Sequence, residues 1–123
     1  MVGNMAMDSF QTTSHTTEGV TTVRLQGELD AQTAVVLEEE FEKLLEKKKY
    51  NVITNGQALQ YIASAGLGVY MAYIERFREE GGDIKVTHLS ERVQHVFDLL
   101  GFSKIIDVLE SDEEAYQRFQ STS

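Results

Sequence analysis

The feature that most constrains the fold is an alternation of strand-length apolar runs with longer amphipathic runs, which continues from residue 20 to residue 119. The long runs repeat apolar residues every three or four positions, which is the period of a helix. The expected order is β-β-α-β-α-β-α-β-α. Helices that separate successive strands indicate a mostly parallel sheet with right-handed crossovers. We therefore expect a single α/β domain. Its mostly parallel, mixed β-sheet should carry an N-terminal antiparallel hairpin and pack against about four helices.

The first two strands are expected to form that hairpin. A threonine-rich segment that starts at about Phe10 favours extended backbone. The pair Glu18-Gly19 is a turn signal, and the apolar run from Val20 to Leu25 follows it directly. This spacing predicts two antiparallel strands, with the first at the edge of the sheet.

Three of the expected helices have an apolar stripe on one face. The second is expected to end at Gly81-Gly82, the third has Ser90 as a suitable N-cap, and the closing helix should begin at Ser111 or Asp112. The residues predicted to be buried are Ala34, Leu37, Phe41, Leu44 and Leu45 in the first helix, Leu67, Tyr70, Met71, Ile74 and Phe77 in the second, and Val93, Val96, Phe97 and Leu100 in the third.

The remaining strands are predicted from shorter patterns. Residues 51–54 should form a strand that ends at Asn55-Gly56, the strongest turn signal in the chain, with a loop up to residue 60. Two further strands are expected, one in which Ile84, Val86 and His88 alternate against Lys85 and Thr87, and a short one over residues 105–108.

Composition argues against several classes of protein. A net charge of −9 disfavours binding to nucleic acid, which needs a basic surface, and docking on anionic membranes. No apolar run approaches the roughly 20 residues of a membrane-spanning helix. The chain has no cysteine, and its three histidines (His15, His88 and His95) lack the spacing of metal ligands, so no metal or other cofactor is expected.

The ends of the chain are polar or lack a clear pattern. The first nine residues have neither the basic segment nor the apolar segment of a secretion signal, so we expect a cytoplasmic protein. We also expect the protein to be monomeric. We expect a disordered tail over residues 1–8, one domain over residues 9–119 and a loose end over residues 120–123.

The stretch YIASAGLGVY, residues 61–70, places a serine at the start of the second expected helix. Functional groups gather in loops at the C-terminal ends of parallel strands, so we expect this stretch and GELDAQT, residues 27–33, to meet and to bring Asp30 and Ser64 to one surface. A phosphoryl group on Ser64 would add about 1.5 to 2 negative charges. Unpaired N–H groups at the helix start would stabilise it, whereas Asp30 and Glu28 would repel it. The alternative is that Ser64 is an N-cap and its small neighbours serve packing.

These segments resemble the STAS domains of bacterial anti-sigma factor antagonists. The resemblance covers about residues 9–119 and rests on GELD, SAGLG and GGDIKV in that order. It implies a partner switch: the unphosphorylated protein binds an anti-sigma factor that is also a serine kinase, phosphorylation of Ser64 releases it, and a PP2C-type phosphatase resets the switch. Ala63 stands where an aspartate often precedes the serine. The partner-binding residues that the resemblance implies are Glu28, Asp30, Thr33, Ala63, Ser64, Ala65, Gly66, Leu67 and Gly68.

The sequence leaves one other function open and argues against two more. A STAS domain with an unphosphorylated serine would act as a scaffold, or bind a small anion or nucleotide, in another regulatory or transport-associated complex. A receiver domain is disfavoured because Asn55 stands where its phosphorylated aspartate would be needed. Hydrolysis is disfavoured because Ser64 lacks a GxSxG elbow. We therefore expect no catalytic residues and no enzymatic activity.

Overall fold

The computed structural model describes residues 9–120. The predicted tail over residues 1–8, and residues 121–123 of the predicted loose end, lie outside the described residues, while Gln120 is the last residue of the closing helix. The elements in chain order are β1 (Phe10–Thr17), β2 (Val20–Leu29), α2 (Ala34–Glu46), β3 (Asn51–Ile62), α3 (Ser64–Glu79), β4 (Asp83–Thr87), α4 (Glu91–Leu99), the 3-10 helix η1 (Phe102–Lys104), β5 (Val108–Leu109) and α5 (Asp112–Gln120).

The strands form one five-stranded sheet in the order β1-β2-β3-β4-β5. β1 pairs with β2 in antiparallel fashion, and every other neighbouring pair is parallel. The predicted fold is therefore confirmed: residues 9–120 contain the N-terminal hairpin, the mostly parallel mixed sheet and four α-helices, where about four were expected.

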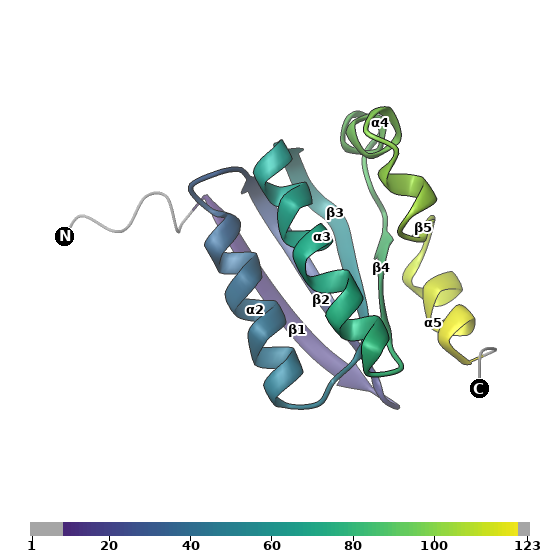
Figure 1. The fold of residues 1–123 in the computed structure, drawn as a ribbon. Coiled ribbons are helices and arrows are strands. Elements are labelled where there is room, and N and C mark those ends of the chain that lie inside the picture. Colours follow the sequence, from purple (N-terminus) through teal and green to yellow (C-terminus); the bar gives the residue numbers. More distant parts are fainter. Residues whose placement is uncertain (1–8, 121–123) are drawn as a thin grey trace.

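The sheet separates two apolar clusters of unequal size. Helices α2 and α3 cover one face (Figure 1), where the ring of Phe41 meets the ring of Tyr70 edge-on at 5.8 Å and the Tyr70 hydroxyl hydrogen-bonds Thr54 Oγ1 at 2.7 Å. Side chains alternate across a strand, so Val20 and Ile53 point to the opposite face. There they form the smaller cluster with residues of β5 and α5.

The turn predicted at Asn55-Gly56 is wrong, because β3 runs through it to Ile62. Between the pairs Arg24–Asn55 and Gln26–Ala58, β3 contains one residue more than β2. A second extra residue lies in β3 between the pairs Gly27–Leu59 and Glu28–Tyr61. The Asn55-Gly56 pair thus lies at the start of a β-bulge within β3, and the strand continues beyond it.

Tertiary contacts explain why the strand continues. Asn55 Nδ2 donates to Asp112 Oδ2 at 2.8 Å, and Asn55 Oδ1 accepts from the Gln57 N–H at 2.9 Å, so both ends of the amide are used. Gly56 is buried, and a Cβ on it would lie 2.7 Å from Leu89 Cδ2. The glycine therefore permits close packing at this point.

Other local predictions also need correction. Met71 and Leu100, expected in buried stripes, are 50% and 55% exposed. Lys85 and Thr87, expected only to alternate with the apolar residues of their strand, are buried as well, because α5 covers that face of the sheet. The last strand lies at Val108–Leu109 and not over residues 105–108, because Gly101 takes a left-handed conformation and the chain first forms η1.

The buried lysine is held by carboxylates at the edge of the α5 face. Lys85 Nζ lies 2.8 Å from Asp107 Oδ2 and 3.0 Å from Asp83 Oδ2, and it also lies over the ring of Phe119. The hydrogen bond from Lys85 lowers the pKa of Asp107 below the ordinary value for aspartate.

We expect Asp107→Asn to lower the free energy of unfolding at neutral pH by about 1 kcal/mol or less, because the carboxylate is partly solvated. A lowered native pKa means that Asp107 stabilises the fold above its unfolded pKa and that this stabilisation is lost as pH falls through the lowered value. Urea unfolding of wild type and variant should therefore converge in strongly acidic buffer. Glu75→Gln, at an exposed position of α3, is the matched control and should change little. A difference at Asp107 that persists unchanged below pH ~3 would contradict this account.

Candidate functional site

The two sequence motifs meet at the C-terminal end of the parallel strands β2 and β3. Leu29 pairs with Ile62 at the end of the ladder, and the Ala63 N–H donates to the Leu29 carbonyl oxygen at 2.9 Å. Asp30 and Ser64 are the next residues after this bond. The structure thus places the two loops side by side at one end of the sheet, as the sequence predicted (Figure 1).

Ser64 is the first residue of α3, and its side chain is exposed. The N-cap position is taken by Ala63, in extended backbone and without a side-chain cap, so the alternative that Ser64 is the N-cap is wrong. Within residues 9–120, the N–H groups of Ser64 and Ala65 have no hydrogen-bond acceptor. The helix therefore starts with free donors and partial positive charge next to an unbonded hydroxyl.

A compact turn holds Asp30 at this surface. Its Oδ1 accepts from the N–H groups of Gln32 at 3.0 Å and Thr33 at 3.1 Å. The buried Thr33 hydroxyl accepts from the Asp30 N–H at 2.9 Å and lies 2.8 Å from the Glu28 carbonyl oxygen. One carboxylate oxygen of Asp30 thus builds the turn, while Oδ2 forms no hydrogen bond within the described part of the chain.

The two glycines of the SAGLG motif have different environments. Gly66 is buried, and a Cβ on it would lie 2.7 Å from Leu29 Cγ and 3.1 Å from Ile62 Cγ1. Gly68 is exposed, and a Cβ there would meet no atom within 4 Å. Gly66 is therefore needed for helix packing on the β2 and β3 ends, and Gly68 leaves the outer face of α3 bare.

The predicted partner-binding residues divide by exposure. Glu28, Ser64 and Gly68 are exposed. Asp30, Ala63 and Ala65 are half-buried, and Thr33, Gly66 and Leu67 are buried beneath them. The segments 27–33 and 61–71 carry the carboxylates of Glu28 and Asp30 and no basic residue, so this surface is acidic.

Neither a metal-holding cluster nor a membrane-spanning helix is found among the described residues. Residues 9–120 contain no cluster of His, Asp or Glu side chains that would hold a metal ion. No helix in the described part of the chain is both long and apolar enough to cross a lipid bilayer.

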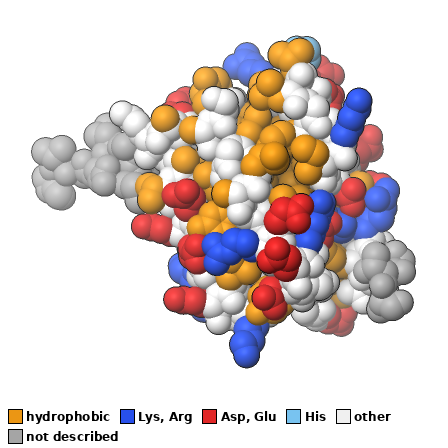
Figure 2. Space-filling model, viewed as in Figure 1, with side chains coloured by type: hydrophobic (Ala, Val, Ile, Leu, Met, Phe, Trp, Pro, Cys, Tyr) orange, Lys and Arg blue, Asp and Glu red, His pale blue; other side chains and the backbone are white. Residues whose placement is uncertain are grey.

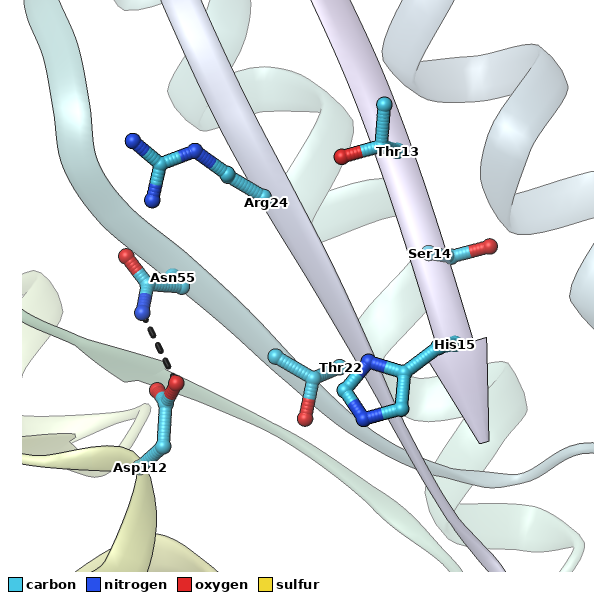
Figure 3. A pocket seen from close by; sticks show the side chains of 7 residues that line it. All are labelled: Thr13, Ser14, His15, Thr22, Arg24, Asn55 and Asp112. Carbon is cyan, nitrogen blue, oxygen red and sulfur yellow. Dashed lines mark hydrogen bonds between the residues drawn. The ribbon is translucent and has the colours of Figure 1, made fainter. Parts of the chain in front are cut away.

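A polar groove of about 330 Å³ lies on the other face of the sheet, beside the start of α5 (Figure 3). Asp112 hydrogen-bonds Asn55 and Thr87 there, which ties α5 to β3 and β4. Arg24 and Asp112 lie on either side of Asn55, so cationic and anionic groups are mixed in the groove. Its lining is Thr13, Ser14, His15, Thr22, Arg24, Asn55 and Asp112.

Comparison with known proteins places the fold and the two motifs in one family. The STAS domain family model matches residues 11–115, and the chain belongs to the STAS domain family, with relatives that are anti-sigma factor antagonists. The anti-sigma-B factor antagonist of Bacillus subtilis (strain 168) is 34% identical over 95 residues, which is 77% of this chain and 86% of the relative.

Solved structures show the same fold. An anti-sigma factor antagonist from Mycobacterium paratuberculosis superposes with a TM-score of 0.82 and 23% identity, over 90% of this chain and 94% of that chain. The Bacillus cell fate determinant SpoIIAA in its phosphorylated form has a TM-score of 0.66 and 22% identity, over 89% and 98% of the two chains.

The two glycines yield a stability prediction. Gly68→Ala should raise the free energy of unfolding by up to about 1 kcal/mol, because alanine favours helix and meets no neighbour. Gly66→Ala should lower it by about 1–3 kcal/mol, because the methyl group overlaps Leu29 and Ile62. Urea unfolding of both variants, each the other's control, checks this. A Gly66→Ala protein as stable as wild type would show that Gly66 is not required for packing.

Proposed function

We propose that this chain is an anti-sigma factor antagonist that acts as a phosphorylation-controlled partner switch. Unphosphorylated, it binds an anti-sigma factor that is also a serine kinase, and this binding frees the sigma factor. Phosphorylation of Ser64 ends the binding, and a PP2C-type phosphatase restores it. The observation that carries the proposal is the exposed, unbonded hydroxyl of Ser64 at the start of α3, beside the Asp30 turn.

Local electrostatics support a phosphoryl group at Ser64. The group would add about 1.5 to 2 negative charges. The N–H groups of Ser64 and Ala65 have no acceptor within residues 9–120 and offer donors for its oxygens. Glu28 and Asp30 already make the surrounding surface acidic. The phosphoryl group would therefore be stabilised by the free N–H groups at the start of α3. It would also make the surface that the partner approaches more negative.

The relatives support an anti-sigma factor as the partner. The Bacillus subtilis relative is named as an antagonist of an anti-sigma factor, and SpoIIAA has been solved in a phosphorylated form. In this proposal, the motif residues that are exposed or half-buried contact the anti-sigma factor directly. The buried residues Thr33, Gly66 and Leu67 hold those residues in position. The switch needs no catalytic residue and no cofactor of its own, and we place it in the cytoplasm as a monomer whose functional domain spans residues 9–119.

The direct test uses each anti-sigma factor of the source organism, purified and incubated with ATP and this chain. Intact mass should rise by about 80 Da, the mass of one phosphoryl group, in wild type and not in Ser64→Ala. Ser64→Ala should still bind the anti-sigma factor, because the unphosphorylated surface is kept. Ser64→Glu should bind at least about tenfold more weakly, because it places a permanent charge there.

Ser90→Ala is the matched control, since Ser90 is also a serine at a helix start but caps α4 by accepting from the Val93 N–H. It should be phosphorylated at the wild-type rate. A mass gain that persists in Ser64→Ala would place the phosphorylation site elsewhere. If no anti-sigma factor adds this mass to the wild-type chain, the proposed phosphorylation switch is wrong.

A second prediction separates the turn from the charge at Asp30. Asp30→Asn keeps an oxygen for the Gln32 and Thr33 N–H groups and removes the charge, so its stability should stay within about 0.5 kcal/mol of wild type. Asp30→Ala loses both the accepting oxygen and the charge, so its free energy of unfolding should be about 1 kcal/mol lower than that of wild type. If the anti-sigma factor contacts the charged carboxylate of Asp30, calorimetry should show that Asp30→Asn binds it more weakly than wild type does. Wild-type affinity and phosphorylation rate in Asp30→Asn would make Asp30 a turn residue only.

A further inference from the structure

One edge of the sheet is formed by a long and regular strand. β1 lies at the end of the strand order, and its eight residues pair with β2 in unbroken register. The strand sequence, FQTTSHTT, contains no Asp, Glu, Lys, Arg or Pro. Charged residues, proline and bulges are the usual features that stop an edge strand from pairing with another chain. The opposite edge is much shorter, because β5 consists of Val108–Leu109. β1 is therefore the edge that is able to accept a further strand.

Alternate residues of β1 direct their backbone groups away from β2. The Glu28 N–H donates to the Ser9 carbonyl oxygen at 2.8 Å, so these two residues form a hydrogen-bonded pair. Such pairs alternate along an antiparallel ladder, which places Thr12, Ser14 and Thr16 in the pairs that are not hydrogen-bonded. The N–H and C=O groups of these three residues point outward, and in the described part of the chain no strand pairs with them.

The side chains of β1 divide between the two faces of the sheet. Thr16 Oγ1 accepts from Lys49 Nζ at 2.9 Å, just beyond the end of α2, so Thr16 lies on the α2 side. Ser14 is two residues earlier and shares this side, and it points away from His15 (Figure 3). A strand added at this edge would likewise direct every second side chain to the α2 side.

A basic pocket of about 250 Å³ lies beside the edge on the α2 side, and Lys43, Lys47 and Lys49 line it together with hydroxyl side chains of β1. Lys43 lies 3.9 Å from Glu40 Oε1, which is its one carboxylate contact in the described part of the chain. Lys49 bonds a hydroxyl, and the Lys47 side chain has no hydrogen bond or ion pair within residues 9–120. Charged side chains also gather over the lower part of the helical face, where α2 ends (Figure 2).

Charge complementarity indicates which kind of strand fits this edge. Carboxylates at alternate positions of an added strand would all point to the α2 side and meet the lysines of the basic pocket. A second copy of this chain fits less well, because its own β1 contains no carboxylate. A small anion would contact the lysines but would leave the outward N–H and C=O groups of β1 without partners.

We propose that β1 accepts an extended acidic segment of another protein as a sixth strand of the sheet. The outward backbone groups of Thr12, Ser14 and Thr16 pair with this segment, and its alternate carboxylates bind in the basic pocket. This surface is separate from the phosphorylation switch. Thr16 pairs with Thr21 near the start of β2, whereas Ser64 follows the opposite end of the strands. The inference therefore does not depend on the proposed function.

The test is a titration of the ¹⁵N-labelled full chain with a synthetic peptide, blocked at both ends, in which threonine and glutamate alternate over about seven residues. In ¹H–¹⁵N correlation spectra, the amide signals of residues 10–17 and 43–49 should shift with peptide concentrations up to about 5 mM, since a short isolated segment binds weakly. Two control peptides have the same length. One alternates threonine with lysine and should cause no shift. The other alternates proline with glutamate and should bind at least about fivefold more weakly, because proline cannot donate to a ladder.

The basic pocket is tested by the double variant Lys43→Gln/Lys47→Gln, which changes two exposed side chains. It should bind the threonine–glutamate peptide about fivefold more weakly than wild type, because two ion pairs at a solvated edge are lost. The matched control is Arg92→Gln/Lys104→Gln, which removes the same charge from exposed positions of α4 and η1, near the opposite edge of the sheet (Figure 1). It should bind as wild type does.

Four results would overturn the inference. Equal binding of the proline–glutamate peptide, or equal shifts with inorganic phosphate, would show that the lysines attract negative charge without an added strand. Equal binding of the threonine–lysine peptide would remove the preference for an acidic segment. Unchanged signals for residues 10–17 would show that the edge does not pair. A wild-type dimer in sedimentation, with the amide signals of β1 broadened in the absence of peptide, would assign the edge to a second copy.

Discussion

The parallel pairing of β2 with β3 is the constraint on which the functional surface depends. It ends in the bond from the Ala63 N–H to the Leu29 carbonyl oxygen, and the chain leaves both strands at this point to form the Asp30 turn and helix α3. Gly66 then allows α3 to pack directly on Leu29. A hydroxyl, a carboxylate and free helix N–H groups are brought together by backbone pairing, with no bond between the two motif side chains.

In the switch that we propose, the same arrangement would let one small modification act on a large surface. The Ser64 hydroxyl forms no hydrogen bond within the described residues, so a change at this hydroxyl removes no hydrogen bond inside the fold. Thr33, which holds the Asp30 turn, and Gly66, which lets α3 pack on Leu29, are both buried beneath this surface. The rigid frame and the modifiable group are thus separate parts of the site.

The predictable parts of the fold were those set by local pattern. The hairpin, the order of elements and the start of α3 at Ser64 follow from residues close together in the sequence. The Asn55-Gly56 pair shows the limit, because its strand conformation depends on pairing with β2, packing on Leu89 and a bond to Asp112, which lies 57 residues away. The burial of Lys85 and the exposure of Met71 likewise depend on where α5 and the edge of α3 lie, which periodicity alone does not specify.

The most direct measurement of the central claim is a ¹H–¹⁵N correlation spectrum of the labelled chain, recorded during titration with its anti-sigma factor. The account predicts that the amide signals of residues 29–33 and 63–71 shift or broaden with the unphosphorylated chain, and that they stay in place when Ser64 carries a phosphoryl group. Signal changes confined to the groove beside α5, or equal changes for both forms of the chain, would contradict it.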